Sequence, residues 1–131
     1  MIFERELISV LTQNGYISNG VSMYGDKPAI FPYYVSSKAA KPYIKFYTEN
    51  YNVPTKSETK ILVIEYVNDE IDLSESQKYS VEIINTLDAR IFESDENGEL
   101  RLYLSGNTSF EGDTLKIRFI LRGDLKLWGV V

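Results

Sequence analysis

The stretch ETKILVIEYVN, residues 58 to 68, constrains the fold more than any other part of the sequence. It is rich in β-branched residues, and its alternating sets are Ile61, Val63, Glu65 and Val67 on one face and Leu62, Ile64 and Tyr66 on the other. A strand that is apolar on both faces over most of its length is covered on both sides. We therefore predict a central strand with a sheet built around it.

A helix is predicted near the N-terminus, in IFERELISVLTQNG. The apolar positions recur at helical spacing, and they are Phe3, Leu7, Val10 and Leu11. Asn14-Gly15 is a typical C-terminal stop signal. The first helix should therefore cover residues 2 to 13.

A second helix is predicted in DLSESQKYSVEIINTLDA. Ser74 and Gln77 have the spacing of a capping box, and Leu73 is placed as its hydrophobic staple. This helix should cover residues 75 to 88. Its buried stripe is predicted to hold Ser80, Val81, Ile83, Ile84, Leu87 and Ile91.

Three further strands are indicated by alternation. They lie in PYIKFYTE, LRLYLS and TLKIRFILRG, and GNTSFEGD between the last two reads as a hairpin loop. A possible short strand covers residues 21 to 24. The inward residues are predicted to be Ile44, Phe46, Leu100, Leu102, Leu104, Leu115, Ile117, Phe119 and Leu121. The order of elements predicts a single α+β domain over residues 1 to 131, with a mostly antiparallel sheet of about four strands and two helices packed on it.

The composition excludes several kinds of chemistry. The chain of 131 residues has no cysteine and no histidine, so a catalytic triad or dyad built on either, and a thiolate metal site, are excluded. We expect no enzyme activity, no cofactor and no bound metal. No basic start followed by an apolar run resembles an export signal, and no apolar stretch approaches the roughly 20 residues of a membrane helix. We expect folding in the cytosol and no membrane contact.

The charge is uneven along the chain. Residues 1 to 60 carry seven Lys/Arg against five Asp/Glu, or +2, whereas residues 61 to 131 carry seven against fourteen, or −7. Two carboxylate clusters lie in the acidic half, at Asp69, Glu70 and Asp72 and at Glu93, Asp95, Glu96 and Glu99. A helix N-terminus and a solvated turn account for them. A metal-dependent hydrolase using Asp69, Glu70 and Asp72 stays open as an alternative.

The segment FPYYVSSKAAKPYIKFYTENY, residues 31 to 51, places seven aromatic rings and three lysines in one stretch. Tyr43, Lys45 and Tyr47 share one strand face, as in proteins that stack single-stranded nucleic acid. The segment lacks the glycines of an RNA-recognition strand, so contact with protein is favoured over a nucleic-acid platform. The candidate interface residues are Tyr33, Tyr34, Lys38, Lys41, Tyr43, Lys45, Tyr47 and Tyr51.

The order of these segments resembles the tail terminator, or tail-completion, proteins of long-tailed bacteriophages and prophages. The resemblance runs through ELISVLTQNG, VSMYGDKPA, KPYIKFY, TKILVIEYV, SESQKYSVEIINTLD and LRLYLSGNTSFEGDTLKIRFIL. The closing GDLKLWGVV, with Trp128, has no counterpart in it, and the acidic turn at residues 93 to 99 is longer than expected.

The resemblance implies a structural protein. Such proteins form a ring, usually a hexamer, that caps the tail tube and joins it to the head connector. The implied partners are further copies of the chain, the tail-tube protein and the head-connector protein, and DNA passes through without specific binding. The implied location is the host cytoplasm during assembly and then the virion tail. The loop NYNVPTKSE is expected to project as an arm toward one of these partners.

Overall fold

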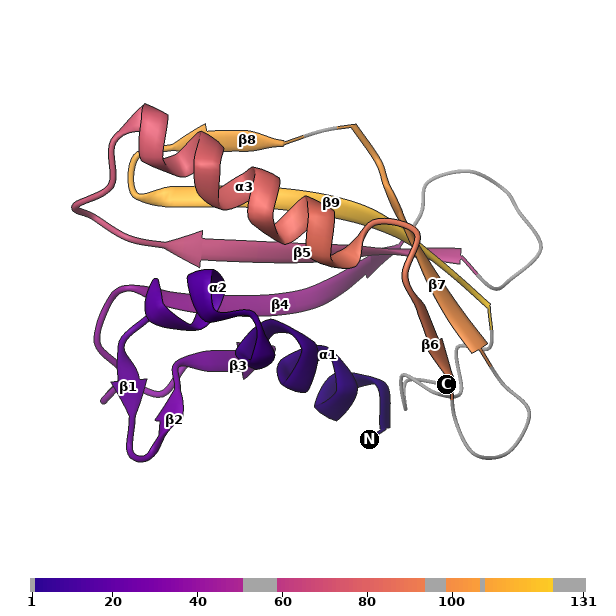
Figure 1. The fold of residues 1–131 in the computed structure, drawn as a ribbon, viewed down its shortest axis with the longest axis horizontal. Helices are drawn as coiled ribbons and strands as arrows, with labels where there is room; N and C mark the ends of the chain where they lie inside the picture. The colour runs from indigo at the N-terminus through magenta and orange to yellow at the C-terminus, as the bar shows by residue number, and fades with distance from the viewer. Residues whose placement is uncertain (1, 51–58, 94–98, 107, 124–131) are drawn as a thin grey trace.

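The computed structural model describes residues 2–50, 59–93, 99–106 and 108–123 (Figure 1). The helices are α1 (Ile2–Gln13), α2 (Gly15–Asn19) and α3 (Leu73–Leu87). The strands are β1 (Met23–Tyr24), β2 (Lys27–Pro28), β3 (Ile30–Pro32), β4 (Tyr43–Asn50), β5 (Thr59–Val67), β6 (Ile91–Glu93), β7 (Glu99–Leu104), β8 (Ser109–Glu111) and β9 (Thr114–Gly123). The predicted α+β class is confirmed.

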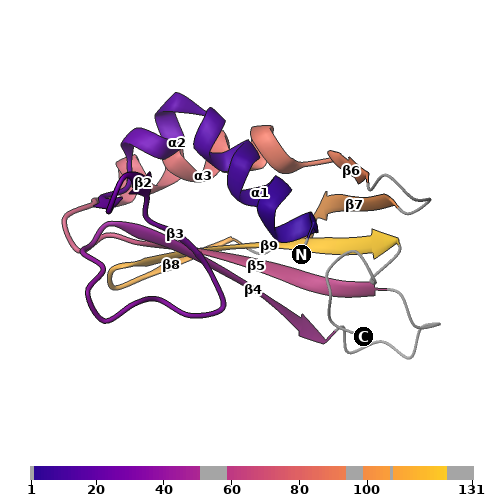
Figure 2. The ribbon, with the colours of Figure 1, turned by 90° about the horizontal axis from the view of Figure 1, so that it is seen from below.

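One curled sheet forms the centre of the fold, and Figure 2 shows the helices together on one side of it. Its strand order is β3-β4-β5-β9-β7-β6, and β8 pairs with β9 as well. β3 runs parallel to β4, whereas the other neighbours in the sheet are antiparallel. β1 and β2 form a separate small hairpin. The sheet is therefore mixed and resembles half a barrel.

The core lies between this sheet and the helices. The inward residues predicted for the long strands are confirmed: all are buried in the core except Leu104, which is partly buried against it. α1 contributes Phe3, Leu7 and Leu11, at the spacing that predicted it. The central position of β5 is also confirmed, because β5 pairs with β4 on one side and β9 on the other. On the face away from the helices Val63 is 0% exposed, whereas Ile61 and Glu65 are half-buried, so this face of β5 is only partly covered.

The predicted count of about four strands and two helices is too low. β3, β6 and β8 have three residues each, too few for alternation to reveal them. The predicted hairpin loop GNTSFEGD contains β8, which turns directly into β9 through Gly112 at φ 61°. The possible strand at residues 21 to 24 is present only as Met23–Tyr24.

The helix ends also differ from the prediction. Asn14 does not only follow α1; its side chain also accepts a hydrogen bond from the Ile17 backbone N–H and caps α2. α3 starts earlier than predicted, because the cap is Asp72, which accepts from the Glu75 backbone N–H at 2.8 Å. The predicted capping box of Ser74 and Gln77 is therefore wrong.

The buried face of α3 also differs from the prediction. Leu73 is 60% exposed and Val81 is 53% exposed, so the first is no staple and the second lies outside the buried stripe. Ile91 belongs to β6 instead and is exposed. The buried positions of the helix are Ser76, Tyr79, Ser80, Ile83 and Leu87. No helix in the described ranges is long and apolar enough to cross a membrane.

Candidate functional site

The outer face of the sheet carries the residues that suggested a stacking platform. Tyr43, Lys45 and Tyr47 alternate with the buried Ile44 and Phe46, so they lie on the side of β4 away from the core. All three are half-buried. The structure thus places them on one face, as the alternation predicted.

Two further cations join this face through the strand register. Lys45 lies opposite Glu65 of β5, and Glu65 lies opposite Lys116 of β9. In the adjacent row, Tyr47, Val63 and Arg118 stand side by side. Lys116 and Arg118 could not be assigned to this face from the sequence, because the strand order was unknown. The face therefore carries three cations together with the carboxylates of Glu49, Glu65 and Glu111.

Some polar and aromatic groups of this face are already engaged in contacts with one another. The Tyr47 hydroxyl donates a hydrogen bond to the Glu65 carboxylate, and the Lys45 ammonium lies over the Tyr47 ring, 5.4 Å from its centroid. Burial, together with the bond to Glu65, raises the pKa of Tyr47. The phenol thus remains a protonated donor near neutral pH, and one side of its ring is already occupied by a cation.

The loop between β3 and β4 separates the other candidate residues. Tyr33 packs against the core, and its backbone N–H donates to the Phe46 carbonyl at 2.9 Å. Lys41 forms an ion pair with Asp113 at 2.7 Å. The hydrogen bond from Lys41 lowers the pKa of Asp113, and the same bond raises that of Lys41. Both of these candidates are therefore engaged within the chain.

Tyr34 and Lys38 remain on the surface. The Tyr34 side chain is 87% exposed, and Lys38 is exposed in the same loop. Tyr51 and most of the loop NYNVPTKSE lie outside the described residues, as do Trp128 and residues 94 to 98 of the acidic turn. The prediction that these parts meet a partner stays a prediction.

The carboxylates do not gather into a metal site. Within the ranges that the structure describes, no three Asp or Glu side chains are grouped so that they could hold a metal ion. Asp72 instead caps α3, and the Asn68 side chain accepts from the Glu70 backbone N–H in the turn before it. The geometry therefore favours the structural interpretation of Asp69, Glu70 and Asp72 over the hydrolase alternative.

Sequence reasoning missed a cleft walled by tyrosines beside the start of α3. It has a volume of about 350 Å³ and is lined by Tyr16, Asn19, Gly20, Tyr66, Asn68, Ile71, Glu75 and Tyr79. The Tyr66 and Tyr79 rings are stacked, with centroids 3.9 Å apart and an interplanar angle of 19°. Tyr16 lies 5.8 Å from Tyr79 in a tilted arrangement. We name this the tyrosine cleft.

Two apolar surface patches are also new. The helix patch consists of the exposed Tyr16, Leu73 and Val81, on α2 and on the outer side of α3. Tyr16 and Val81 line one shallow groove of about 460 Å³, in which polar side chains lie among the apolar ones: Ser74, Gln77, Lys78 and Glu82. The hairpin patch consists of Met23 and Tyr24 on β1. Figure 1 shows the hairpin beyond β3, whereas α3 lies across β5 and β9. The two patches therefore occupy different parts of the surface.

In comparisons with known proteins, no family model, no curated protein and no solved structure matches the chain.

Proposed function

We propose that the chain is a structural subunit of the tail terminator type, which assembles into a ring that caps a phage tail tube and joins it to the head connector. The resemblance in element order suggested this function. The observation that carries it is the presence of two different apolar patches on one subunit. A ring needs a heterologous interface, in which one patch of a subunit meets a different patch of the next.

The helix patch and the hairpin patch suit such an interface. Large apolar side chains grouped on a surface mark contact sites more often than single exposed ones do. Leu73 and Val81 lie two turns apart on one side of α3, and Tyr16 of α2 widens this strip. Met23 and Tyr24 project from a two-stranded hairpin that stands outside the main sheet. The exposed Tyr34 and Lys38, in the loop after β3, are available to the same partner.

The overall charge is compatible with a ring through which DNA slides. The formal net charge of the chain is −5, and an acidic subunit repels a polyanion. The interior of a ring with this net charge would hold DNA weakly and would release it. No catalytic residue is needed for that role.

Mixing two interface variants tests the ring directly. Met23→Glu damages the hairpin patch and Val81→Glu damages the helix patch. Each variant alone should be monomeric, because a heterologous contact needs both patches. The two mixed together should form a 1:1 dimer, since one intact interface remains and the ring cannot close. The control is Tyr103→Glu. Tyr103 is exposed on β7, outside both patches, so this variant should assemble as the natural chain does.

Light scattering after size-exclusion chromatography gives the masses, with and without a tail-tube protein. A natural chain that stays monomeric under both conditions would refute the proposed function. Variants that each retain full assembly would show that the interface lies elsewhere.

A binding domain for single-stranded nucleic acid is the second candidate, and the added cations Lys116 and Arg118 favour it. Fluorescence anisotropy with a labelled oligothymidine should then show binding. The logarithm of the association constant should fall against the logarithm of the salt concentration with a slope of about −2, which corresponds to three neutralised phosphates. Lys45→Ala and Arg118→Ala should weaken it, whereas Lys38→Ala should not. No binding at low salt excludes this function.

A further inference from the structure

The walls of the tyrosine cleft are held in place by their hydroxyl groups. The Tyr66 hydroxyl donates to the Gly20 carbonyl at 2.5 Å, and the Tyr79 hydroxyl donates to the Ile17 carbonyl at 2.6 Å. Asn68 donates to the Tyr66 oxygen at 3.0 Å. Both rings are stacked and nearly buried, so they cannot turn away when a ligand enters. The cleft is therefore preorganised, which reduces the entropy lost on binding.

The mouth of the cleft is acidic. Glu75 lines it, and the adjoining turn carries three exposed carboxylates, Asp69, Glu70 and Asp72. None of the four forms an ion pair within the part of the chain that the structure describes. No lysine or arginine lines the cleft. Lys41 is close enough to Asp69 for their charges to interact, whereas Glu75 has no ion-pair partner among the described residues.

Tyr66 and Tyr79 stay neutral. Burial raises the pKa of Tyr66, and the nearby charge of Glu75 acts in the same direction. Burial also raises the pKa of Tyr79. A neutral ring presents a negative face, which attracts a cation and does not attract an anion. Tyr66 and Tyr79 are each 3% exposed and stack on each other, so the ring that a ligand can reach is that of Tyr16, which is 50% exposed. The cleft pairs this ring with the Glu75 carboxylate, and that pairing suits an organic cation.

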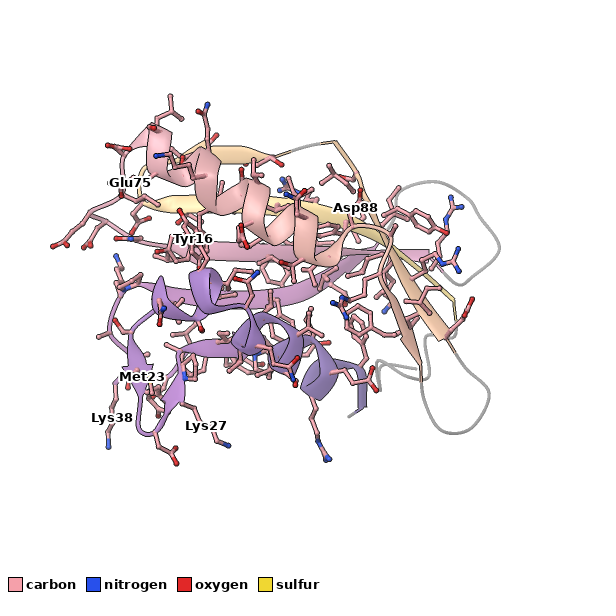
Figure 3. All side chains as sticks on the ribbon, in the orientation of Figure 1. Tyr16, Met23, Lys27, Lys38, Glu75 and Asp88 are labelled. Carbon is pink, nitrogen blue, oxygen red and sulfur yellow. The ribbon has the colours of Figure 1, made fainter. Side chains whose placement is uncertain are left out.

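We propose that the tyrosine cleft binds the ammonium or guanidinium group of a basic side chain, supplied by a second copy of this chain. The identity of the donor rests on the proposed ring, whereas the cation preference does not. Lys27 and Lys38 are exposed, and neither forms an ion pair within the described residues. Figure 3 shows both at the hairpin end, near Met23 and away from Glu75. Tyr16 belongs to both the cleft and the helix patch, so one neighbour can cover the two together.

The first experiment tests the cation preference without any ring. The Met23→Glu full-length chain is labelled with ¹⁵N and titrated with N-acetylarginine amide or with N-acetylcitrulline amide, which has nearly the same shape and no charge. The arginine probe should shift the amide signals of Gly20, Asn68 and Glu75 with millimolar affinity. The citrulline probe should bind roughly fivefold more weakly or not at all.

A matched pair of variants assigns this effect to the cleft. Glu75→Gln removes the carboxylate at the mouth and should weaken the arginine probe about fivefold. Glu111→Gln makes the same charge change in the β8–β9 turn and should leave binding unchanged. Equal binding of the two probes, or full binding by Glu75→Gln, overturns the cation site.

The second experiment identifies the donor by exchanging charges. Two variants are compared: the single variant Glu75→Lys, and a double variant that carries both Lys27→Glu and Lys38→Glu. Each should weaken self-association at least tenfold, and a 1:1 mixture of the two proteins should recover it in part. If the arginine probe binds but Lys27→Glu with Lys38→Glu assembles normally, the second copy is not the donor. If the natural chain never associates, the donor and the proposed function are both refuted, while the probe titration still decides the cation site.

Discussion

Gly20 lies against the ring of Tyr79, and the packing there makes Gly20→Ala a sharp test of the fold. A Cβ atom added at Gly20 would stand 2.4 Å from Tyr79 Cε1 and 3.0 Å from its hydroxyl oxygen. The ring cannot yield easily, because it is stacked on Tyr66 and its hydroxyl is bonded to the Ile17 carbonyl. Something in this packing must therefore shift.

Two effects of opposite sign decide the outcome. Gly20 has φ −84° and ψ 0°, a conformation that alanine adopts without strain. Replacing glycine in such a position stabilises a protein by about 0.4–1 kcal/mol, because the unfolded chain loses freedom. Overpacking of a well-packed site costs about 1–3 kcal/mol. We expect a net loss of about 1–2 kcal/mol, which lowers the midpoint of urea unfolding by about 1 M.

Unfolding in urea, followed by circular dichroism, measures this change. Gly15→Ala is the matched control, since a Cβ there meets nothing within 4 Å and should leave stability unchanged or raise it by up to about 1 kcal/mol. In a Tyr79→Leu background the cost of Gly20→Ala should disappear, because the two sites are coupled. A Gly20→Ala protein as stable as the natural chain would refute the close packing of Tyr79. So would a loss of stability from Gly20→Ala that persists in the Tyr79→Leu background, because leucine is too short to meet the new Cβ.

Three further substitutions have expected outcomes in the same assay. Gly123→Ala should cost about 2–4 kcal/mol, more than Gly20→Ala, because its φ is +128° and the new Cβ would lie 2.0 Å from the Glu99 carbonyl oxygen; a smaller loss would contradict that geometry. Ala89→Gly should stabilise by about 0.5–1 kcal/mol, since Ala89 follows α3 at φ 61°; a loss of stability would show that the left-handed conformation is wrong. Burial raises the pKa of Glu4 above 4.5, so the folded state binds this proton more tightly and Glu4 contributes stability as pH falls through its raised pKa toward 4.5. Glu4→Gln should be the more stable protein at pH 7, with its advantage shrinking toward pH 4.5, and an advantage independent of pH would exclude this cause.

The long strands could be predicted because each carries a two-residue period over many positions. Ile44 and Phe46, for example, are fully buried as the alternation required, and β5 is central because both of its faces are apolar. Strands of three residues carry no such signal. β3 also pairs in parallel with β4, which requires the connection of residues 33 to 42 to bring the chain back to the starting end of β3, and alternation does not reveal such a return. The sheet was therefore predicted correctly in its middle and not at its edges.

The error in α3 has a physical origin in its first turn. Asp72 and Ser74 are both good cap residues, and each is followed three positions later by an acidic or amide side chain, Glu75 or Gln77. The sequence does not separate these alternatives. The choice of cap sets where α3 begins but not which face is buried, because the helical period places the same side chains on one face in either case. The buried face holds Tyr79 and Ile83, whereas Leu73 lies outside it.

The absence of Tyr79 from the predicted buried stripe explains why the tyrosine cleft was not anticipated. The cleft needs Tyr79 inside, and it also needs α2, whose Ile17 carbonyl and neighbouring Gly20 carbonyl hold the two tyrosine hydroxyls. α2 has only five residues and follows an apparent stop signal, so periodicity cannot find it. A buried tyrosine requires a partner for its hydroxyl. Asking which backbone carbonyl could serve Tyr66, on a strand predicted to be covered on both faces, is the sequence question that would have pointed to this region.

The aromatic rings of residues 31 to 51 lie in different environments in the folded chain. These rings are used mainly within the subunit: Tyr33 packs on the core, Phe46 is buried in it, and Tyr47 is bonded to Glu65. Tyr34 alone among the described rings of this segment is almost fully exposed. Single exposed rings are common on protein surfaces, so contact between Tyr34 and a partner stays a prediction.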